Sequence, residues 1–139
     1  MDNIEQLVSI TDAFQWVKSR PYIDGALMVA RGTGRILDCC GTLSVVGRVD
    51  EMSDTLCRIF TSEDPFKLPS EYFNFVLCNT KFQIVQIDRE RVTASSKNRR
   101  KQLVIENMPW GLVIFLFSAP NQFSRVRGEV DKWAHNHRS

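Results

Sequence analysis

The residue types that most often perform chemistry are sparse in this chain. Both of its histidines, His135 and His137, lie at the far C-terminal end, and terminal residues are usually poorly ordered. A nucleophilic serine or cysteine needs a positioned base, so this placement argues against a Ser–His–Asp or Cys–His site. No acidic pair has a clear partner at a strand end. We therefore expect a binding protein and not an enzyme.

The four cysteines, Cys39, Cys40, Cys57 and Cys78, do not form a metal-binding pattern. Two are adjacent, the others are isolated, and no C-x-x-C pair accompanies them, unlike the ligand spacing of a zinc site. Each lies in an apolar stretch. We expect free, buried or half-buried thiols in a reducing compartment, and neither a metal nor another cofactor.

Basic residues gather at two turns and at the start of the last predicted helix. They are Lys97, Arg99, Arg100 and Lys101 in one turn, Arg89 and Arg91 in the turn before it, and Arg125 and Arg127 in the helix. The net charge is only +2, so any affinity for anions must come from this clustering. The pattern predicts either a solvated turn or a basic edge that binds an acidic protein surface or phosphoinositide headgroups. We expect no nucleic-acid binding, because no aromatic residues are interleaved with the cluster to stack bases.

Aromatic residues near the two ends of the chain form a second candidate group. If the terminal helices pack side by side, Phe14 and Trp16 meet Trp133, His135 and His137, and the group could hold an extended proline-rich peptide. Phe14 and Trp133 also fall on the apolar stripes of their helices. The alternative is therefore that both are core residues, and the sequence leaves the two possibilities open.

Length and composition fit one domain that spans residues 1–139. The chain is 43% hydrophobic and 24% charged, as expected for a protein with a substantial core. No apolar run approaches the roughly 18 residues of a membrane-spanning helix, and the acidic, amphipathic N-terminus does not read as a signal peptide. We therefore expect a cytosolic protein.

Apolar periodicity predicts three helices and seven strands. The helices are expected at 4–17, 49–60 and 121–137, and the strands at 25–30, 35–40, 73–78, 82–87, 91–94, 103–106 and 112–117. The glycines at 32 and 34 fit a hairpin turn that needs a positive φ, because no other element of a phosphate-binding loop follows them. The strands run together instead of alternating with helices. The sequence therefore predicts an α+β fold: a central antiparallel sheet of about six or seven strands, with the N- and C-terminal helices packed on it.

The chain resembles the profilin family in the order of its helices, in three stretches and at one proline. These are residues 80–86 (TKFQIVQ), similar to a strand of that family, residues 95–98 (SSKN) at its basic turn, residues 103–115 along its last two strands, and Pro120 before its last helix. The resemblance implies a protein, mainly monomeric, that binds actin monomers and regulates actin polymerisation in the cytoplasm and cytoskeleton. Proline-rich proteins and phosphoinositides are the further partners that it implies.

The resemblance also implies which residues bind each partner. The actin-binding residues would be Lys81, Gln83, Gln86, Lys97, Arg125 and Arg127. Phosphoinositides or other anions would meet Arg99, Arg100 and Lys101, where the family usually has glycines. The strand tryptophan and the last-helix aromatic of the family's proline-peptide site are replaced by Leu37 and Asn136. These departures predict weak or absent binding of proline-rich peptides.

The opening of the chain also resembles a second family. Residues 23–29 and the hairpin at 34–37 are similar to the start of the roadblock family of dynein light chains and GTPase-associated adaptors. That family usually has fewer strands after its middle helix and forms homodimers. The five strands expected after residue 60 and the long last helix favour profilin.

Overall fold

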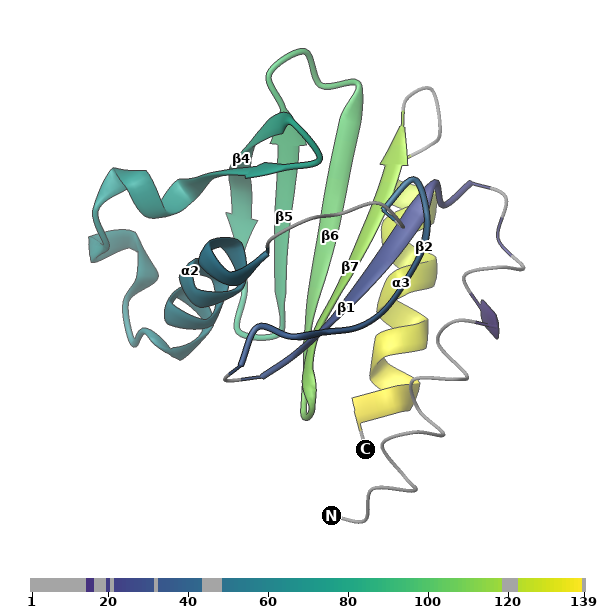
Figure 1. The fold of residues 1–139 in the computed structure, drawn as a ribbon, viewed down its shortest axis with the longest axis horizontal. Helices are drawn as coiled ribbons and strands as arrows, with labels where there is room; N and C mark the ends of the chain where they lie inside the picture. The colour runs from purple at the N-terminus through teal and green to yellow at the C-terminus, as the bar shows by residue number, and fades with distance from the viewer. Residues whose placement is uncertain are drawn as a thin grey trace.

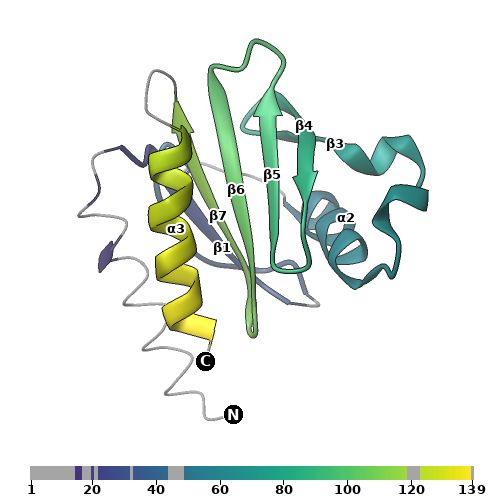
Figure 2. The ribbon, with the colours of Figure 1, turned by 180° about the vertical axis from the view of Figure 1, so that it is seen from behind.

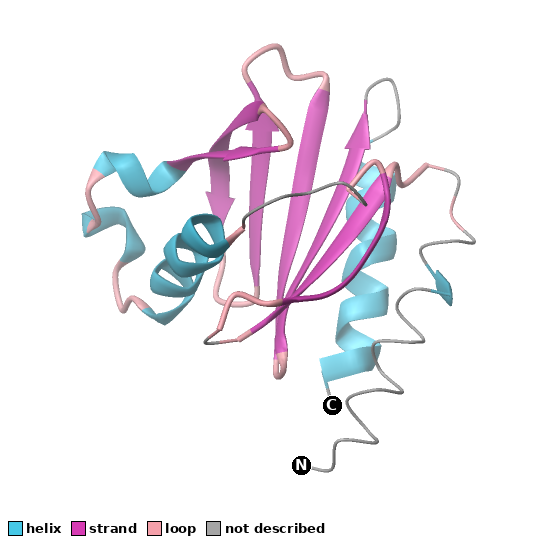
Figure 3. Cartoon of the chain, in the orientation of Figure 1, coloured by secondary structure: helices cyan, strands magenta, loops and turns pink. Residues whose placement is uncertain are grey.

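A computed structural model describes residues 15–16, 20, 22–31, 33–43, 49–118 and 123–138, without the side chains at 50, 123–125 and 138. Two strands, β1 (Gly25–Ala30) and β2 (Ile36–Gly41), precede the helix α2 (Asp50–Thr61). Two short 3₁₀ helices follow, η1 (Pro65–Lys67) and η2 (Ser70–Phe73). Then come β3 (Asn74–Leu77), β4 (Thr80–Ile87), β5 (Arg91–Ser96), β6 (Lys101–Met108), β7 (Gly111–Ser118) and the helix α3 (Phe123–Arg138). Figure 3 shows these elements by type.

All seven strands form one antiparallel sheet in the order β2-β1-β7-β6-β5-β4-β3 (Figure 1). From β3 to β7 each strand pairs with its neighbour in the chain, since the turns are too short for any other arrangement. β1 then pairs with β7, which brings the first and the last strand-forming segments of the described chain together. The predicted α+β fold with a central antiparallel sheet is confirmed.

The sheet has an apolar layer on each face. Because side chains alternate along a strand, β7 sends Leu112 and Ile114 to one face and Val113 and Phe115 to the other, and all four are buried. This double burial explains why the strand reads as an unbroken apolar run. Of the predicted N-terminal helix, only residues 15 and 16 are described, and both are helical.

Of the two long helices that the structure describes, α2 lies on one face of the sheet and α3 on the other. On α2, Met52, Leu56 and Ile59 pack against one face. On α3, Val126, Val130 and Trp133 pack against the other. The core on the α3 side draws its buried strand residues from β1, β6 and β7. Figure 2 shows α3 in front of β7 and β1, while β5 and β4 lie beyond β6 and are not covered by it. The α3-side surface of β3, β4 and β5 is therefore left bare of helices and is called the open face below.

The structure lengthens several of the predicted strands. The strand expected at 91–94 extends to Ser96 in β5, and the one expected at 103–106 spans Lys101–Met108 in β6. The strands expected at 82–87 and 112–117 begin earlier, at Thr80 and Gly111. Polar strand ends caused these errors, because hydrogen-bonded ladders continue beyond the last apolar residue. Between α2 and β3 the chain forms η1 and η2.

Two glycines allow the β1 hairpin and the β1–β7 pairing. Gly34 has a φ of 68° in the turn after β1, as the sequence predicted. Gly111 begins β7 opposite Ala30, and a Cβ there would lie 2.0 Å from the carbonyl oxygen of Val29. Only glycine permits the two backbones to come this close.

Candidate partner-binding face

The strand β4 presents its polar side chains on the open face. Phe82 and Ile84 are buried on the α2 side, whereas Lys81 and Gln83, which alternate with them along the strand, are exposed. This alternation is typical of a strand with one face on the core and one face in solvent. The strand thus delivers two of the predicted actin-binding side chains to the same surface.

A β-bulge at Val85 enlarges this surface. The register with β5 shifts between Ile84, opposite Ala94, and Gln86, opposite Thr93. The extra residue puts both Val85 and Gln86 in exposed positions before the strand returns to the core, as a bulge of one residue does. Val85 is consequently 61% exposed, although it is a β-branched apolar residue.

Val85 lines three hollows. The first, of about 610 Å³, is also lined by Lys81, Gln83, Lys97 and Arg99. The second, of about 410 Å³, extends from Val85 and Gln86 to the aromatic rings of the segment before β3, Phe66 and Phe73. The third, of about 280 Å³, is lined by Val85, Thr93, Ala94, Ser95, Arg99 and Gln102. One apolar side chain is therefore surrounded by polar and basic ones.

The basic turn between β5 and β6 is held by side-chain hydrogen bonds. The Ser96 hydroxyl donates to Asn98 Oδ1 at 2.8 Å and accepts from the Lys101 N–H at 3.1 Å. Asn98 Oδ1 also accepts from the Arg100 N–H at 3.1 Å, and the Arg99 N–H donates to the Ser96 carbonyl at 2.9 Å. Serine and asparagine commonly close turns in this way, so the turn has a defined shape.

The turn distributes its cations to both faces of the sheet. Lys97 and Arg99 line the first hollow on the open face. Lys101 lies two residues before Leu103 on β6 and therefore on the same face of the sheet, and the Leu103 side chain belongs to the α2-side core. The Lys101 ammonium group influences the pKa of Cys78. Burial raises the pKa of the Cys78 thiol, and the Lys101 ammonium offsets part of that rise. The predicted anion-binding trio of Arg99, Arg100 and Lys101 is thus divided, because Arg100 lines none of the three hollows.

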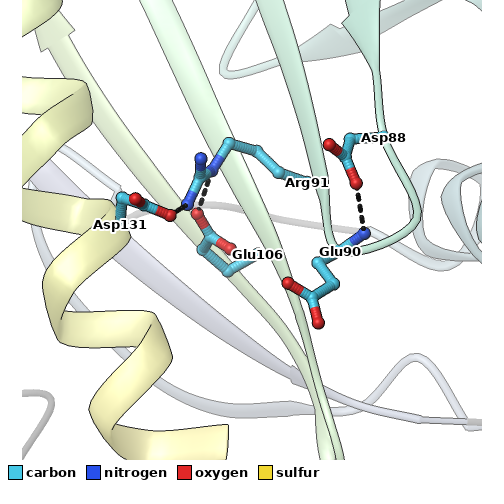
Figure 4. A network of polar contacts seen from close by, with 5 residues as sticks. All are labelled: Asp88, Glu90, Arg91, Glu106 and Asp131. Atoms are coloured by element: carbon cyan, nitrogen blue, oxygen red, sulfur yellow. Dashed lines mark hydrogen bonds and ion pairs between the residues drawn. The ribbon is translucent and has the colours of Figure 1, made fainter.

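A buried ion-pair network marks the border between the open face and α3 (Figure 4). Arg91 on β5 donates from Nε to Glu106, its cross-strand partner on β6, and from Nη2 to Asp131 of α3 at 2.6 Å. The Glu106 side chain is fully buried and that of Asp131 is 64% exposed. Burial alone would lower the pKa of the Arg91 guanidinium, but the hydrogen bonds and charges of Asp131 and Glu106 raise it. The network fixes α3 to β5 and β6.

One predicted site residue of α3, Arg127, lies on the flank of the helix that carries this network. Arg127 precedes Asp131 by four positions, so the two lie on the same flank of the helix, and Arg127 is partly exposed. Arg125 also belongs to α3, but its side chain lies outside what the structure describes. The structure therefore brings together Lys81, Gln83, Gln86 and Lys97 on the open face and places Arg127 on the helix that borders it.

The predicted proline-peptide residues lie in a different place. Trp133 is buried beneath Trp16, with ring centroids 5.8 Å apart, and it also stacks on His137 at 4.7 Å. Phe115 packs edge-on against both tryptophans. His135 is exposed and takes no part in these ring contacts, while Phe14 lies outside the described residues. Trp133 is thus a core residue that also belongs to an aromatic stack.

Sequence reasoning missed the apolar and buried polar parts of the open face. Val76 on the open face is 56% exposed, and Phe66 of η1, which lines the second hollow, is 76% exposed. Thr93 Oγ1 and Gln102 Oε1 are buried and have no hydrogen-bond partner among the described residues. The one available signal was Val85, an apolar residue that interrupts the alternation of β4. The other side chains could be placed only once the strand register was known.

The described residues lack two further kinds of feature. Within that part of the chain, no cluster of three or more histidine, cysteine, aspartate or glutamate side chains could hold a metal ion. No helix there is long and apolar enough to cross a membrane.

Comparison with known proteins links the chain to one fold. No family model and no curated protein matches the sequence. Among solved structures, Loki profilin 1 in its complex with rabbit actin superposes with a TM-score of 0.66 at 15% identity, over 98% of this chain and 95% of that one. Loki profilin 2, also in complex with rabbit actin, gives 0.67 at 11% identity over 98% and 96%. Profilin II of Acanthamoeba castellanii gives 0.67 at 15% over 88% and 93%. At these identities the likeness concerns the fold, and on that basis the chain has a divergent profilin-like fold.

Proposed function

We propose that this chain binds actin monomers through the open face and regulates actin polymerisation. The observation that carries the proposal is the position of Val85, an exposed apolar residue between three hollows, with Lys81, Gln83 and Gln86 beside it. Four of the six predicted actin-binding residues lie on this face. Two of the structurally similar profilins were solved with rabbit actin, which supports the same class of partner here.

The chemistry of the open face suits a protein surface better than a small molecule. Protein interfaces combine an apolar centre with a polar rim, and here Val76 and Val85 supply the apolar area. The surrounding side chains are amides, hydroxyls and cations, and the rim cations Lys81 and Lys97 would steer an acidic partner toward the face. Binding without a chemical step follows from this proposal, as does a cytoplasmic, cytoskeleton-associated location.

A roadblock-type dimer was the alternative. Five strands follow α2, and α3 is 16 residues long, which matches the features that favoured profilin over that family. A profilin-like protein is expected to be mainly monomeric. Sedimentation velocity at low micromolar concentration separates the two, and a stable dimer would support the roadblock-type reading.

The proposal is tested by the assembly of pyrene-labelled actin. Excess protein should sequester monomers and slow spontaneous nucleation. Val85→Asp places a charge at the centre of the face and should remove most of this effect, because central apolar contacts dominate interface energies. Thr42→Asp is the matched control, since Thr42 is also β-branched and exposed but follows β2 at the other edge of the sheet. Wild-type protein that changes neither nucleation nor monomer affinity would end the actin proposal.

A further inference from the structure

Arg99 occupies a backbone conformation that its side chain disfavours. Its φ is 59°, in the left-handed region where Cβ crowds the following carbonyl and glycine is the usual residue. Replacing Arg99 with glycine would relieve this strain and keep the turn, because the hydrogen bonds of the turn use Ser96, Asn98 and backbone groups. A strained residue that is not needed for its own turn points to a role for its side chain.

The side chain of Arg99 reaches two hollows at once. It lines the first hollow together with Lys81 and Lys97, and it lines the third together with Thr93 and Gln102. No carboxylate lines either hollow. No ion pair among the described residues uses Lys81, Lys97 or Arg99. This part of the open face is therefore an uncompensated positive surface.

Two residues that line the third hollow, Thr93 and Gln102, each have a buried polar atom without a hydrogen-bond partner among the described residues. Thr93 is 2% exposed, and its Oγ1 makes no hydrogen bond to any described residue. Gln102 Oε1 is also buried and also lacks a hydrogen-bond partner among the described residues. Buried polar groups are nearly always paired, so two unpaired ones in one hollow of about 280 Å³ indicate that a ligand completes them.

The types of these groups specify the ligand. Arg99 and the Thr93 hydroxyl can each donate to a carboxylate, whereas Gln102 Oε1 can only accept. An aspartate or glutamate residue matches all three, since its carboxylate accepts twice and its own backbone N–H donates once. We propose that the third hollow binds an acidic side chain of the protein partner, whose carboxylate pairs with the Arg99 guanidinium. The neighbouring residues of the partner then lie in the first hollow, beside Lys81 and Lys97. This inference rests on the proposed function, whose partner site it details.

A membrane surface fits these observations less well than an acidic peptide. A flat layer of headgroups would need the cations on one face, but Lys101 lies on the α2 side of the sheet while Arg99 lies on the open face. Thr93 is 2% exposed and lines a hollow that is formed by side chains. A protruding side chain can enter such a hollow and a planar layer cannot.

Three variants test the inference by fluorescence anisotropy. The probes are a labelled hexaglutamate peptide at low ionic strength and labelled actin monomers. Arg99→Gly should weaken both interactions about tenfold, since a charge-assisted hydrogen bond is lost, and its melting temperature should stay equal or rise by up to about 4 °C. Thr93→Val, of equal size, should weaken both about threefold without lowering the melting temperature, because the hydroxyl is unpaired in the free protein. Arg100→Gly is the control and should change neither affinity by more than about twofold.

The outcomes separate this inference from the actin proposal. Equal affinities of Arg99→Gly and Arg100→Gly for actin would refute the proposed role of Arg99 and would not contradict actin binding itself. Wild-type protein that binds hexaglutamate through Arg99 but does not bind actin would support the acidic hollow and refute the choice of partner. Binding to vesicles of phosphatidylcholine with phosphatidylinositol bisphosphate, without binding to hexaglutamate, would also overturn the inference.

Discussion

Neutralising Glu106 should destabilise this protein far more than neutralising Asp131, although both carboxylates pair with Arg91. The Glu106 side chain is fully buried, that of Arg91 is only 14% exposed, and that of Asp131 is 64% exposed. Removing one partner of a buried ion pair leaves an uncompensated charge and typically costs about 3–5 kcal/mol. In Glu106→Gln the amide still accepts one hydrogen bond and Asp131 still offers a counter-charge. We therefore expect the lower end of that range, about 3 kcal/mol.

Asp131→Asn should cost less than about 1 kcal/mol, because solvent screens the exposed carboxylate. Urea denaturation followed by circular dichroism measures both values as shifts of the transition midpoint at constant slope. At roughly 3–4 °C per kcal/mol, Glu106→Gln should also melt about 10 °C below the wild type. The double variant Arg91→Met with Glu106→Leu should lose less stability than Glu106→Leu alone, since no unpaired charge remains. Equal costs for Glu106→Gln and Asp131→Asn would refute this account of the network.

Three further predictions concern the helix border, the aromatic stack and the sheet. Arg127→Glu should slow association with actin at low salt, because rim charges steer encounter, and an unchanged association rate in stopped flow would count against that flank. Polyproline should bind weakly or not at all, since Trp133 is buried under Trp16, and a micromolar affinity by tryptophan fluorescence would contradict this. Gly111→Ala should cost about 3 kcal/mol or prevent folding, because its Cβ would meet the Val29 carbonyl at 2.0 Å. A wild-type denaturation midpoint for that variant would show that the β1–β7 spacing is misjudged.

The strands could be predicted from the sequence because burial leaves a direct trace in it. β7 is apolar at almost every position since both of its faces are covered, and β4 alternates since only one is. The pairing of consecutive strands from β3 to β7 followed from the short turns, but the pairing of β1 with β7 did not. The strand ends were not predicted either, because they carry polar side chains such as Ser95 and Lys101.

The candidate site was harder to predict because it depends on register. A shift of one residue reverses the face of every side chain in a strand. The bulge at Val85 and the first residue of β6 therefore decide which cations share a surface. The resemblance to profilins identified Lys81, Gln83, Gln86 and Lys97 together, and these lie on one face. The resemblance did not indicate that Arg99 and Lys101 lie on opposite faces of the sheet. It also did not indicate that Thr93 has a buried hydroxyl without a partner among the described residues.

Site-specific photocrosslinking tests most directly whether the open face binds actin. A benzophenone amino acid replaces Val85 at the centre of the face in one variant. It replaces Asp54, exposed on α2 across the sheet, in the other. The account predicts an efficient crosslink to actin monomers from position 85 and none from position 54. A crosslink from position 54 with none from position 85, or none from either, would contradict it.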